Sequence, residues 1–311
     1  MPFLKVEGLT AEYITQRGTL RALDDVNFQL EKGESIGIAG ESACGKSTLG
    51  LAIMRMLQGG KVTSGNIIFD GTSILKIPER EFNRKHRWKD ISIVFQGAMN
   101  SLDPVFTIKK QFIEILKQHN FKGDYLETIS QAIKSVTLTE SVLEKYPHEL
   151  SGGMKQRIVI AMALLLKPKF VIADEPTTAL DVLVQAQIIN LLKKLKKQGM
   201  SIMLITHDLA VLSEISDKIG IMYGGKMVEF GSAEEIFRNP KHPYTQALLE
   251  SIPSLKGDKK PKYIKGNPIS LIDPPLGCRF IDRCPQAMEK CKKNPPQFKT
   301  DSGYSLCWLY E

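Results

Sequence analysis

The sequence predicts an α/β fold in which buried strands carry polar side chains to one edge of a mainly parallel sheet. Three short apolar runs predict it: residues 35–39 lead into a glycine-rich loop and a helix, residues 170–173 end at two acids, and residues 201–206 end at His207. Ligands of open α/β sheets bind at the carboxyl ends of the strands. The polar groups that follow these runs are therefore the candidate functional residues.

The chain has 311 residues, of which 42% are hydrophobic, enough to bury the core of one large domain or two. Its N-terminus lacks a basic region followed by an apolar stretch, so we expect no secretory signal. The longest apolar run, residues 158–166, is about half of the roughly 20 residues that a membrane-spanning helix needs. We therefore expect a cytosolic protein that does not span a membrane.

The formal net charge of +8 comes largely from two lysine-rich stretches. Residues 193–197 lie on the polar side of a predicted amphipathic helix and are expected to face solvent. Residues 256–265 are mixed with Gly, Pro and Asp, which predicts a flexible linker. Neither stretch has the interleaved aromatics of a single-strand nucleic-acid platform, so no nucleic-acid partner is expected.

The first thirty residues predict a small antiparallel sheet. Residues 4–13 alternate as a strand does, and residues 26–30 are the expected partner across a polar turn at 16–19. Tyr13 in the first strand could stack on a purine ring. The alternative, an aromatic that is simply half-buried in a strand, stays open.

The glycine-rich loop fits the phosphate-binding pattern of two glycines four residues apart, followed by Lys and Ser. Its residues are Gly40, Glu41, Ser42, Ala43, Cys44, Gly45, Lys46, Ser47 and Thr48. The loop joins a predicted strand to a helix at 47–56, so its backbone N–H groups, the helix dipole and Lys46 all favour an anion, and Ser47 can bind magnesium. Together these groups favour a bound polyphosphate. The alternative, an ordinary Gly-rich turn before a helix, would leave the Lys–Ser pair and the flanking strand and helix as coincidences.

The middle of the chain alternates strands with helical stretches. Residues 66–69 and 91–95 are predicted strands, and Gln96 follows the second at the edge where ligands bind. Residues 108–136 form a fairly polar helical pattern that predicts an inserted helical region. Ser151, Gly152 and Gly153 then open an apolar helix that runs to residue 166 and make a second anion site, which we expect to serve a nucleotide held by another subunit.

Two acids follow the buried strand at 170–173. Burying paired carboxylates is costly, so a magnesium ion is the expected partner of Asp174, and Glu175 is left to orient or deprotonate a water. The alternative is a pair of solvated turn acids. His207 is expected to touch the terminal phosphate. Residues 218–223 and 226–230 predict a hairpin, and helical segments at 232–238 and 244–250 follow.

Taken together, these motifs resemble an ABC-type ATPase, and the match covers residues 4–251. By this resemblance, residues 40–48 are the Walker A loop, Gln96 the Q-loop and residues 150–156 the signature motif. The fold implied is a P-loop ABC ATPase core at residues 1–252, mainly a parallel sheet, with an N-terminal antiparallel β subdomain, an inserted helical subdomain at about 98–168 and a small Cys-rich extension at 253–311.

The resemblance also implies a role for each matching residue. Asp174 is the Walker B acid, Glu175 the catalytic glutamate, Asp181 the D-loop residue and His207 the switch histidine, while Tyr13 is the adenine-stacking aromatic. The implied catalytic residues are Glu175, His207, Gln96 and Lys46. The implied magnesium ligands are Ser47, Gln96 and Asp174, and the implied ATP contacts beyond the Walker A loop are Tyr13, Gln96, Ser151, Gly152, Gly153, Gln156, Asp174 and Asp181.

The tail narrows the resemblance to one branch of that family. Residues 239–249, 277–280 and 283–285 resemble the ATP-binding subunits of dipeptide and oligopeptide importers, a branch that includes nickel and oligosaccharide systems. In several such subunits the C-terminal cysteines are associated with a four-iron, four-sulfur cluster. This chain has four: Cys278, Cys284, Cys291 and Cys307. Their spacing lacks the close Cys-x-x-Cys pairs of a zinc ribbon, which favours iron–sulfur over zinc, in a structural role.

The branch implies its partners and its place in the cell. A second ATPase subunit, most often a paralogue, two integral membrane permease subunits and an extracytoplasmic substrate-binding protein are expected, at the cytoplasmic face of the membrane. After the glutamine, the branch often has an acidic residue and a proline, and residues 97–104 of this chain depart from that pattern. Because of this departure, both peptide and oligosaccharide stay open as cargo. Two functions outside transport stay open: a soluble ABC ATPase of DNA repair or of the ribosome, and a redox sensor with an attached ATPase.

Overall fold

The computed structural model describes residues 2–251 and 264–311. The chain divides into two compact units: one contains Met1–Lys76 and Leu204–Glu311, and the other contains Ile77–Met203. We call them the first and the second unit. The boundary falls inside strand β8 (Ser201–Ile205), whose five residues are all buried. The domain boundary predicted between residues 252 and 253 lies outside the described residues. Most of the linker predicted at 256–265 does so too.

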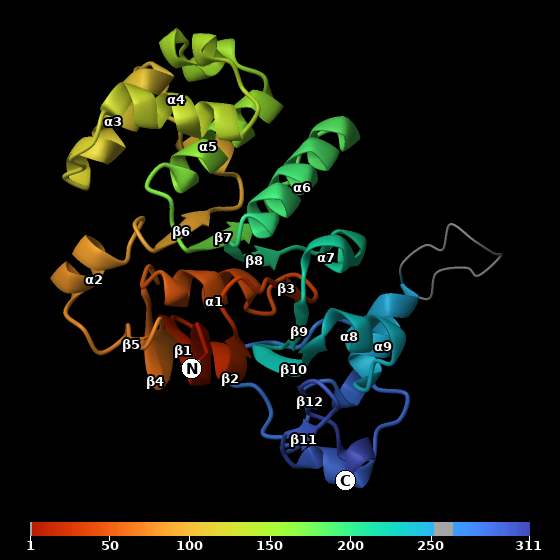
Figure 1. The fold of residues 1–311 in the computed structure, drawn as a ribbon. Coiled ribbons are helices and arrows are strands. Elements are labelled where there is room, and N and C mark those ends of the chain that lie inside the picture. The colour runs from red at the N-terminus through yellow and green to blue at the C-terminus, as the bar shows by residue number, and fades with distance from the viewer. Residues whose placement is uncertain (1, 252–263) are drawn as a thin grey trace. The chain divides into compact units, whose positions relative to one another are not determined.

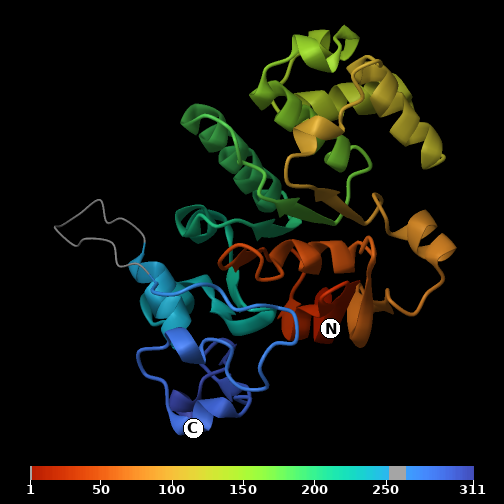
Figure 2. The same ribbon diagram turned by 180° about the vertical axis from the view of Figure 1, so that it is seen from behind.

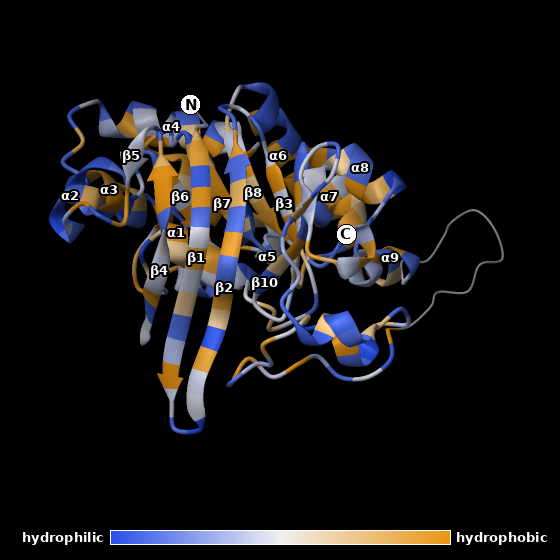
Figure 3. Ribbon diagram, turned by 90° about the horizontal axis from the view of Figure 1, so that it is seen from below, coloured by the Kyte–Doolittle hydropathy of each residue, from blue (hydrophilic) through white to orange (hydrophobic). Residues whose placement is uncertain are grey.

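The first unit begins with an antiparallel sheet in the order β2-β1-β4-β5. The long strands β1 (Leu4–Thr15) and β2 (Gly18–Leu30) form a hairpin, and β4 (Gly60–Phe69) pairs with the other side of β1. Figure 3 shows these strands side by side, with hydrophilic and hydrophobic bands along them. The alternation follows from the period of two in a strand, which buries one face of the sheet. A short β5 (Thr72–Ser73) pairs with β4.

In the first unit, the strand that leads into the glycine-rich loop is part of a parallel pair. Strand β3 (Ile36–Ala39) pairs in parallel with β9 (Lys218–Tyr223), and β9 forms the predicted hairpin with β10 (Lys226–Ser232). Helix α1 (Lys46–Ile53) follows the loop, and α7 (Leu209–Ile215) precedes β9. The buried strands need no polar alternation because both faces are covered.

The end of the chain packs against the same hairpin. Helices α8 (Ala233–Arg238) and α9 (Pro243–Glu250) follow β10, and Figure 1 and Figure 2 show the C-terminal segment, coloured blue, beside them. Two short strands, β11 (Phe298–Lys299) and β12 (Tyr304–Ser305), extend the sheet from β10. Short 3-10 turns make up much of the rest, at Ile281–Arg283, Glu289–Lys292 and Trp308–Tyr310.

The second unit contains a parallel pair of strands and several helices. Its strands β6 (Ile91–Val94) and β7 (Phe170–Asp174) pair in parallel and are fully buried. Its helices are α2 (Glu79–Lys85), α3 (Ile108–Gln118), α4 (Tyr125–Ser135), α5 (Gly152–Leu164) and α6 (Val182–Lys197). In α6, Leu191, Leu192 and Leu195 are buried while Lys194 and Lys197 are exposed, as the amphipathic pattern predicted.

The predicted α/β class is confirmed, but several element bounds were wrong. Strand β2 begins at Gly18 and not near residue 26, and β4 begins at Gly60 and not at residue 66. The missed part of β4 is polar and largely exposed, and in the missed part of β2 the adjacent residues Ala22 and Leu23 are both buried, so neither part shows the apolar alternation that marks a strand. They are strands because β1 supplies partners for their backbone groups along its whole length. Helix α2 and strand β5 were not predicted.

Candidate functional site

The loop at residues 40–48 closes around the ammonium group of Lys46. The residue is only 7% exposed, and its Nζ donates to the carbonyl oxygens of Gly40 and Glu41, each at 2.8 Å. These oxygens replace the water that a buried ammonium loses. The loop therefore encloses this ammonium group, at the position where the sequence predicts a phosphate site.

Two glycines allow the loop to turn this tightly. Gly40 has φ +150°, and a Cβ there would lie 2.1 Å from the carbonyl oxygen of Met222. Gly45 has φ +102°, and a Cβ there would lie 2.2 Å from the carbonyl oxygen of Ala22. Gly45 is also the N-cap of α1, where no side chain caps the first turn. The first N–H groups of the helix are thus left for an anion.

The C-terminal part of the first unit holds the loop from outside. The N–H of Glu41 donates to Tyr244 Oη at 2.9 Å, and the Glu41 carboxylate accepts from both terminal nitrogens of Arg283, at 2.7 and 2.8 Å. The N–H of Gly225 donates to the carbonyl of Cys44 at 3.0 Å. The hydrogen bond that Arg283 donates to Glu41 raises the pKa of Arg283, and burial raises the pKa values of Tyr244 and Cys44.

The other candidate residues of the first unit differ in how far they are exposed to solvent. Ser47 and Thr48 are half-buried in the first turn of α1, whereas Ser42 and Ala43 are exposed at the tip of the loop. Tyr13 is half-buried, and its ring lies against Gly60, where a Cβ would come within 2.5 Å of Cε1. The ring thus takes space that Gly60 leaves on the neighbouring strand, β4.

In the same unit, His207 lies two residues after β8, and its side chain is exposed. The next residue, Asp208, caps α7 by accepting from the N–H groups of Ala210 and Val211, at 2.9 and 3.3 Å. The histidine is therefore held at a fixed point between a strand end and a helix start.

In the second unit, two of the candidate residues, Gln96 and Glu175, contact each other. Gln96 Nε2 donates to Glu175 Oε2 at 3.1 Å, and Thr178 Oγ1 donates to the same oxygen at 2.9 Å. Glu175 has φ +46°, a left-handed conformation that strains a non-glycine residue. Asp174, the last residue of β7, is 5% exposed. The strand end thus presents one buried and one oriented carboxylate.

The residues of the second predicted anion site mark a helix start. Ser151 is the N-cap of α5, and its Oγ accepts from the N–H of Met154 at 3.4 Å. Gly153 packs so closely that a Cβ would lie 2.7 Å from Val184 Cγ1, while Gly152 is exposed. The glycines therefore leave an accessible backbone at the start of α5.

Two further candidates have contacts inside the second unit. Gln156 is buried, and its Nε2 donates to the carbonyl of Pro176 at 2.8 Å, so this amide connects α5 to the turn after β7. Asp181 is the N-cap of α6 and accepts from the N–H of Val184 at 2.9 Å. Both side chains thus support the backbone that carries the candidate site.

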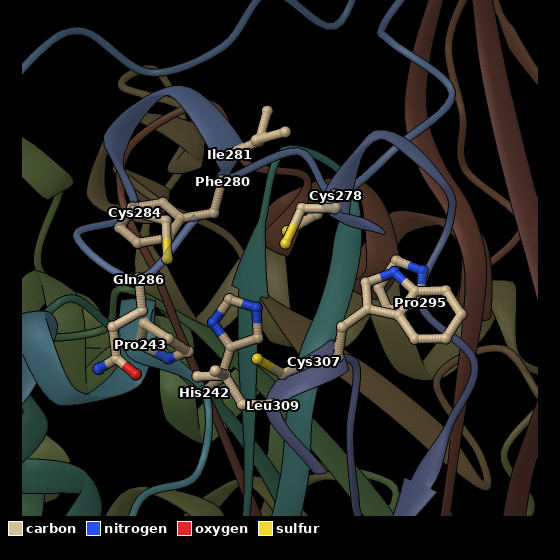
Figure 4. A pocket seen from close by; sticks show the side chains of 12 residues that line it. His242, Pro243, Cys278, Phe280, Ile281, Cys284, Gln286, Pro295, Cys307 and Leu309 are labelled. Atoms are coloured by element: carbon tan, nitrogen blue, oxygen red, sulfur yellow. The ribbon is translucent and has the colours of Figure 1, made fainter. Parts of the chain in front are cut away.

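The four C-terminal cysteines line one small pocket of ≈ 10 Å³ in the first unit. Figure 4 shows Cys278, Cys284 and Cys307 around this space together with His242. All five cysteines of the chain are free thiols. Burial raises the pKa of Cys278 to about 11 and also raises those of Cys284 and Cys307. In the described residues, no three His, Cys, Asp or Glu side chains are arranged to hold a metal ion.

His242 is a pocket residue that the sequence did not single out as a site. It is 1% exposed, its Nδ1 accepts from the N–H of Tyr244 at 3.0 Å, and its Nε2 has no hydrogen-bond partner in the described part of the chain. Burial lowers its pKa to about 3, so the ring is neutral. Because Nδ1 accepts, the proton is on Nε2, so this nitrogen is a buried donor on the pocket wall and not a metal ligand.

The donor set of this pocket fits a thiolate-bound group in its chemistry. Four cysteines line it, and soft thiolate donors suit zinc and iron–sulfur clusters. The ≈ 10 Å³ space admits about one water molecule, so a larger group requires the loops that carry the cysteines to move apart.

The fold and the phosphate-type loop define an ABC-type ATPase. Among solved structures, the chain is similar to the dimeric structure of a post-hydrolysis state of the ATP-binding cassette MJ0796 bound to ADP and Pi (TM-score 0.66, 28% identity, 74% of this chain and 98% of that one). It is also similar to cbiO1 from Clostridium perfringens (TM-score 0.65, 32% identity, 76% and 91%).

Family models assign the chain further. The ABC transporter model matches residues 23–178, and the model of the oligopeptide/dipeptide transporter C-terminal region matches residues 228–291. The chain therefore belongs to the ABC transporter ATP-binding proteins, in the branch with this C-terminal region. As an ABC ATPase it hydrolyses ATP, and ATP and Mg²⁺ are its expected ligands.

Curated relatives match over nearly the whole chain. The dipeptide transport ATP-binding protein DppD of Caldanaerobacter subterraneus is 43% identical (99% of this chain, 97% of the relative). The oligopeptide transport ATP-binding protein OppD of Escherichia coli is 44% identical (94% and 88%). Of the described residues, none forms a helix that is long and apolar enough to cross a bilayer.

Proposed function

We propose that the chain is the ATP-hydrolysing subunit of a peptide importer. The observation that carries this proposal is the Lys46 ammonium, held by loop carbonyls beside an uncapped helix start. In this role Lys46 and the loop amides bind the β- and γ-phosphates, and Tyr13 stacks on the adenine. The other loop residues that would contact the phosphates are Gly40, Glu41, Ser42, Ala43, Cys44, Gly45, Ser47 and Thr48.

Magnesium and the attacking water are assigned to residues at strand ends. Ser47, Gln96 and Asp174 would hold Mg²⁺ directly or through water, and His207 would steady the γ-phosphate. Glu175 would position the water. The contacts from Gln96 and Thr178 to its carboxylate support this role, because they fix one oxygen and leave the group oriented.

A second ATPase subunit would complete each site. In this proposal Ser151, Gly152 and Gly153 reach the γ-phosphate bound by the partner, and Asp181 and Gln156 shape that surface. Val182 and Leu183, next to Asp181, are 78% and 77% exposed, which is unusual for apolar side chains and suits a surface that a partner covers. The dimeric structure of MJ0796 supports the same arrangement by likeness.

The membrane subunits would bind the second unit. A groove of ≈ 370 Å³ there is lined by Phe106, Lys110, Ile113, Glu114 and Lys117. Val105 and Phe106 beside it are 69% and 42% exposed, so an apolar segment of a permease can pack on them. The chain would thus sit peripherally at the cytoplasmic face, with two permease subunits and an external substrate-binding protein.

Peptide is the proposed cargo, supported by the relatives' names. Transport assays with the companion subunits decide between peptide and oligosaccharide or nickel.

The catalytic assignment is tested by Glu175→Gln. We expect the variant to bind MgATP and to dimerise, with ATP hydrolysis by the assembled transporter lowered at least a hundredfold, because the amide cannot take a proton from water. Glu144→Gln, at a glutamate whose side chain is 72% exposed in the same unit, is the matched control and should leave hydrolysis unchanged. Near-normal turnover by Glu175→Gln would refute the assigned base.

We further propose that Cys278, Cys284, Cys291 and Cys307 hold a metal group, with an iron–sulfur cluster favoured over zinc. Their shared pocket and the His242 N–H donor support this. When bound, such a cluster would cross-link the C-terminal segment through its iron–thiolate bonds. The protonated thiols must lose their protons first, so binding releases protons and is pH-dependent.

Anaerobic purification followed by absorption spectroscopy and metal analysis tests the cluster. The parent chain and a Cys44→Ser control should be brown and contain iron, because Cys44 does not line the pocket, whereas Cys278→Ser should lose most of the iron. A colourless chain that is free of iron and loaded with zinc would overturn the cluster in favour of zinc.

A further inference from the structure

We propose that Arg283 is a positioning residue for ATP binding: it fixes Glu41 of the phosphate loop, so that the C-terminal segment completes the nucleotide site. This inference rests on the proposed function of that loop. Arg283 lies one residue before Cys284, far along the chain from the loop, and it touches no proposed substrate atom. It acts through Glu41, which lies between it and Lys46.

The guanidinium of Arg283 is held rigidly. Its side chain is 6% exposed, and it forms the two parallel hydrogen bonds to Glu41 that give an arginine–carboxylate pair its directional strength. Nε donates to the carbonyl of Lys265 at 2.9 Å, and Nη1 also reaches Tyr223 Oη at 3.2 Å. The group also lies 5.6 and 5.9 Å from the ring centroids of Tyr223 and Phe280.

Glu41 is consequently fixed by three of its groups. Its carboxylate is bound by Arg283, its N–H by Tyr244 Oη, and its carbonyl accepts from Lys46 Nζ at 2.8 Å. The carbonyl that holds the catalytic lysine thus belongs to a residue whose side chain and N–H are both anchored by later parts of the chain. Release of the side chain would let this carbonyl move, and the lysine with it.

Charge gives Arg283 a second effect on the same site. Without it, the Glu41 carboxylate, whose side chain is 22% exposed, would lie near bound phosphates without this cationic partner. Like charges at short range in a partly buried site repel strongly. A neutral residue at 41 removes this repulsion. The effect of Arg283 on nucleotide affinity should therefore depend on Glu41, which a purely structural role would not require.

The test measures MgADP binding to the full-length chain by calorimetry. Arg283→Met should raise the Kd about tenfold, and Arg283→Lys, which keeps the charge but not the paired geometry, should raise it by less. Glu41→Gln keeps one acceptor oxygen for Arg283 and should raise the Kd by less than Arg283→Met does, and Arg283→Met in the Glu41→Gln background should add less than twofold. Lys292→Met, at an exposed pair with Glu289 in the same segment, is the control and should bind as the parent does.

Two results would overturn the inference. If Arg283→Met leaves the Kd within twofold of the parent, Arg283 does not position the loop. If Arg283→Met weakens MgADP binding equally in the parent and in the Glu41→Gln background, and also lowers the melting temperature of the nucleotide-free chain in proportion, the role of Arg283 is structural. Lys46→Ala separates these outcomes from failure of the proposed function, because a chain that still binds MgADP normally without Lys46 does not use this loop.

Discussion

At the scale of single residues, the backbone around Lys46 decides the candidate site. The ammonium is held inside the loop because the carbonyl oxygens of Gly40 and Glu41 accept its hydrogen bonds, and Gly40 and Gly45 with their positive φ values give the loop the turn that brings these carbonyls to it. The position of the Lys46 ammonium therefore depends on the conformation of the two glycines. Substitution of either glycine should affect the fold and the nucleotide affinity together.

Gly45→Ala tests this close approach. Its added Cβ would lie 2.2 Å from the carbonyl of Ala22, so we expect a loss of about 3 kcal/mol in the free energy of unfolding, measured by urea denaturation, together with loss of MgADP binding. Gly59→Ala is matched, because Gly59 also has positive φ, +70°, but its Cβ would meet nothing within 4 Å. It should cost about 1 kcal/mol and keep binding. Equal losses would contradict the steric explanation.

At the scale of elements, the candidate residues of the second unit lie at the ends of helices and strands. Ser151 and Asp181 are both N-caps, of α5 and α6, and each accepts from a backbone N–H of the first turn. A cap residue satisfies the helix whether or not a ligand is present. Stability measurements alone therefore cannot reveal a role in catalysis, and a capping residue far from the site is the necessary comparison.

Ser151→Ala and Asp124→Ala provide that comparison. Asp124 caps α4, accepting from the N–H of Glu127 at 2.9 Å, and is not among the proposed site residues. Each variant should lower the free energy of unfolding by about 1 kcal/mol. Only Ser151→Ala should also reduce ATP hydrolysis by the assembled transporter, by tenfold or more, if it completes the partner's site. Equal hydrolysis in both variants would limit Ser151 to capping.

At the scale of the whole chain, buried arginines connect the C-terminal segment to the rest of the first unit. Arg279 is 4% exposed, donates to the carbonyl of Gly224 in the β9–β10 turn, and pairs with Asp24 of β2 at 2.5 Å. Lys226 also reaches Asp24, at 3.2 Å. Residues more than 250 positions apart in sequence thus form one network.

Arg279→Met should be strongly destabilising. It leaves Asp24 with fewer charged partners and the Gly224 carbonyl without this donor, so we expect a loss of about 3 kcal/mol in the free energy of unfolding, measured by urea denaturation. Arg238→Met, at a surface pair with Glu234 in which both side chains are more than 70% exposed, should cost less than about 0.5 kcal/mol. A small effect at Arg279 would show that the segment contributes little to the fold.

The sequence predicted the α/β class and most strands because buried strands read as short apolar runs, and glycine and capping residues mark their ends. It missed the outer halves of β2 and β4, where pairing with β1 replaces apolar alternation as the cause of the strand. It also missed Arg283 and His242 as site residues. An arginine beside a cysteine, or a histidine before a proline, carries no local pattern that reveals its neighbour in space.

The sequence by itself determined which groups are available: the phosphate-type loop, the two acids at the end of β7, the capped start of α5 and the four cysteines. These are local, because a turn, a cap or a strand end depends on adjacent residues. Only the tertiary structure decided that Arg283, 242 residues after Glu41, and Tyr244, 203 residues after it, hold the loop. Such contacts arise when distant segments share one buried core, where a charged group is stable only beside its partner.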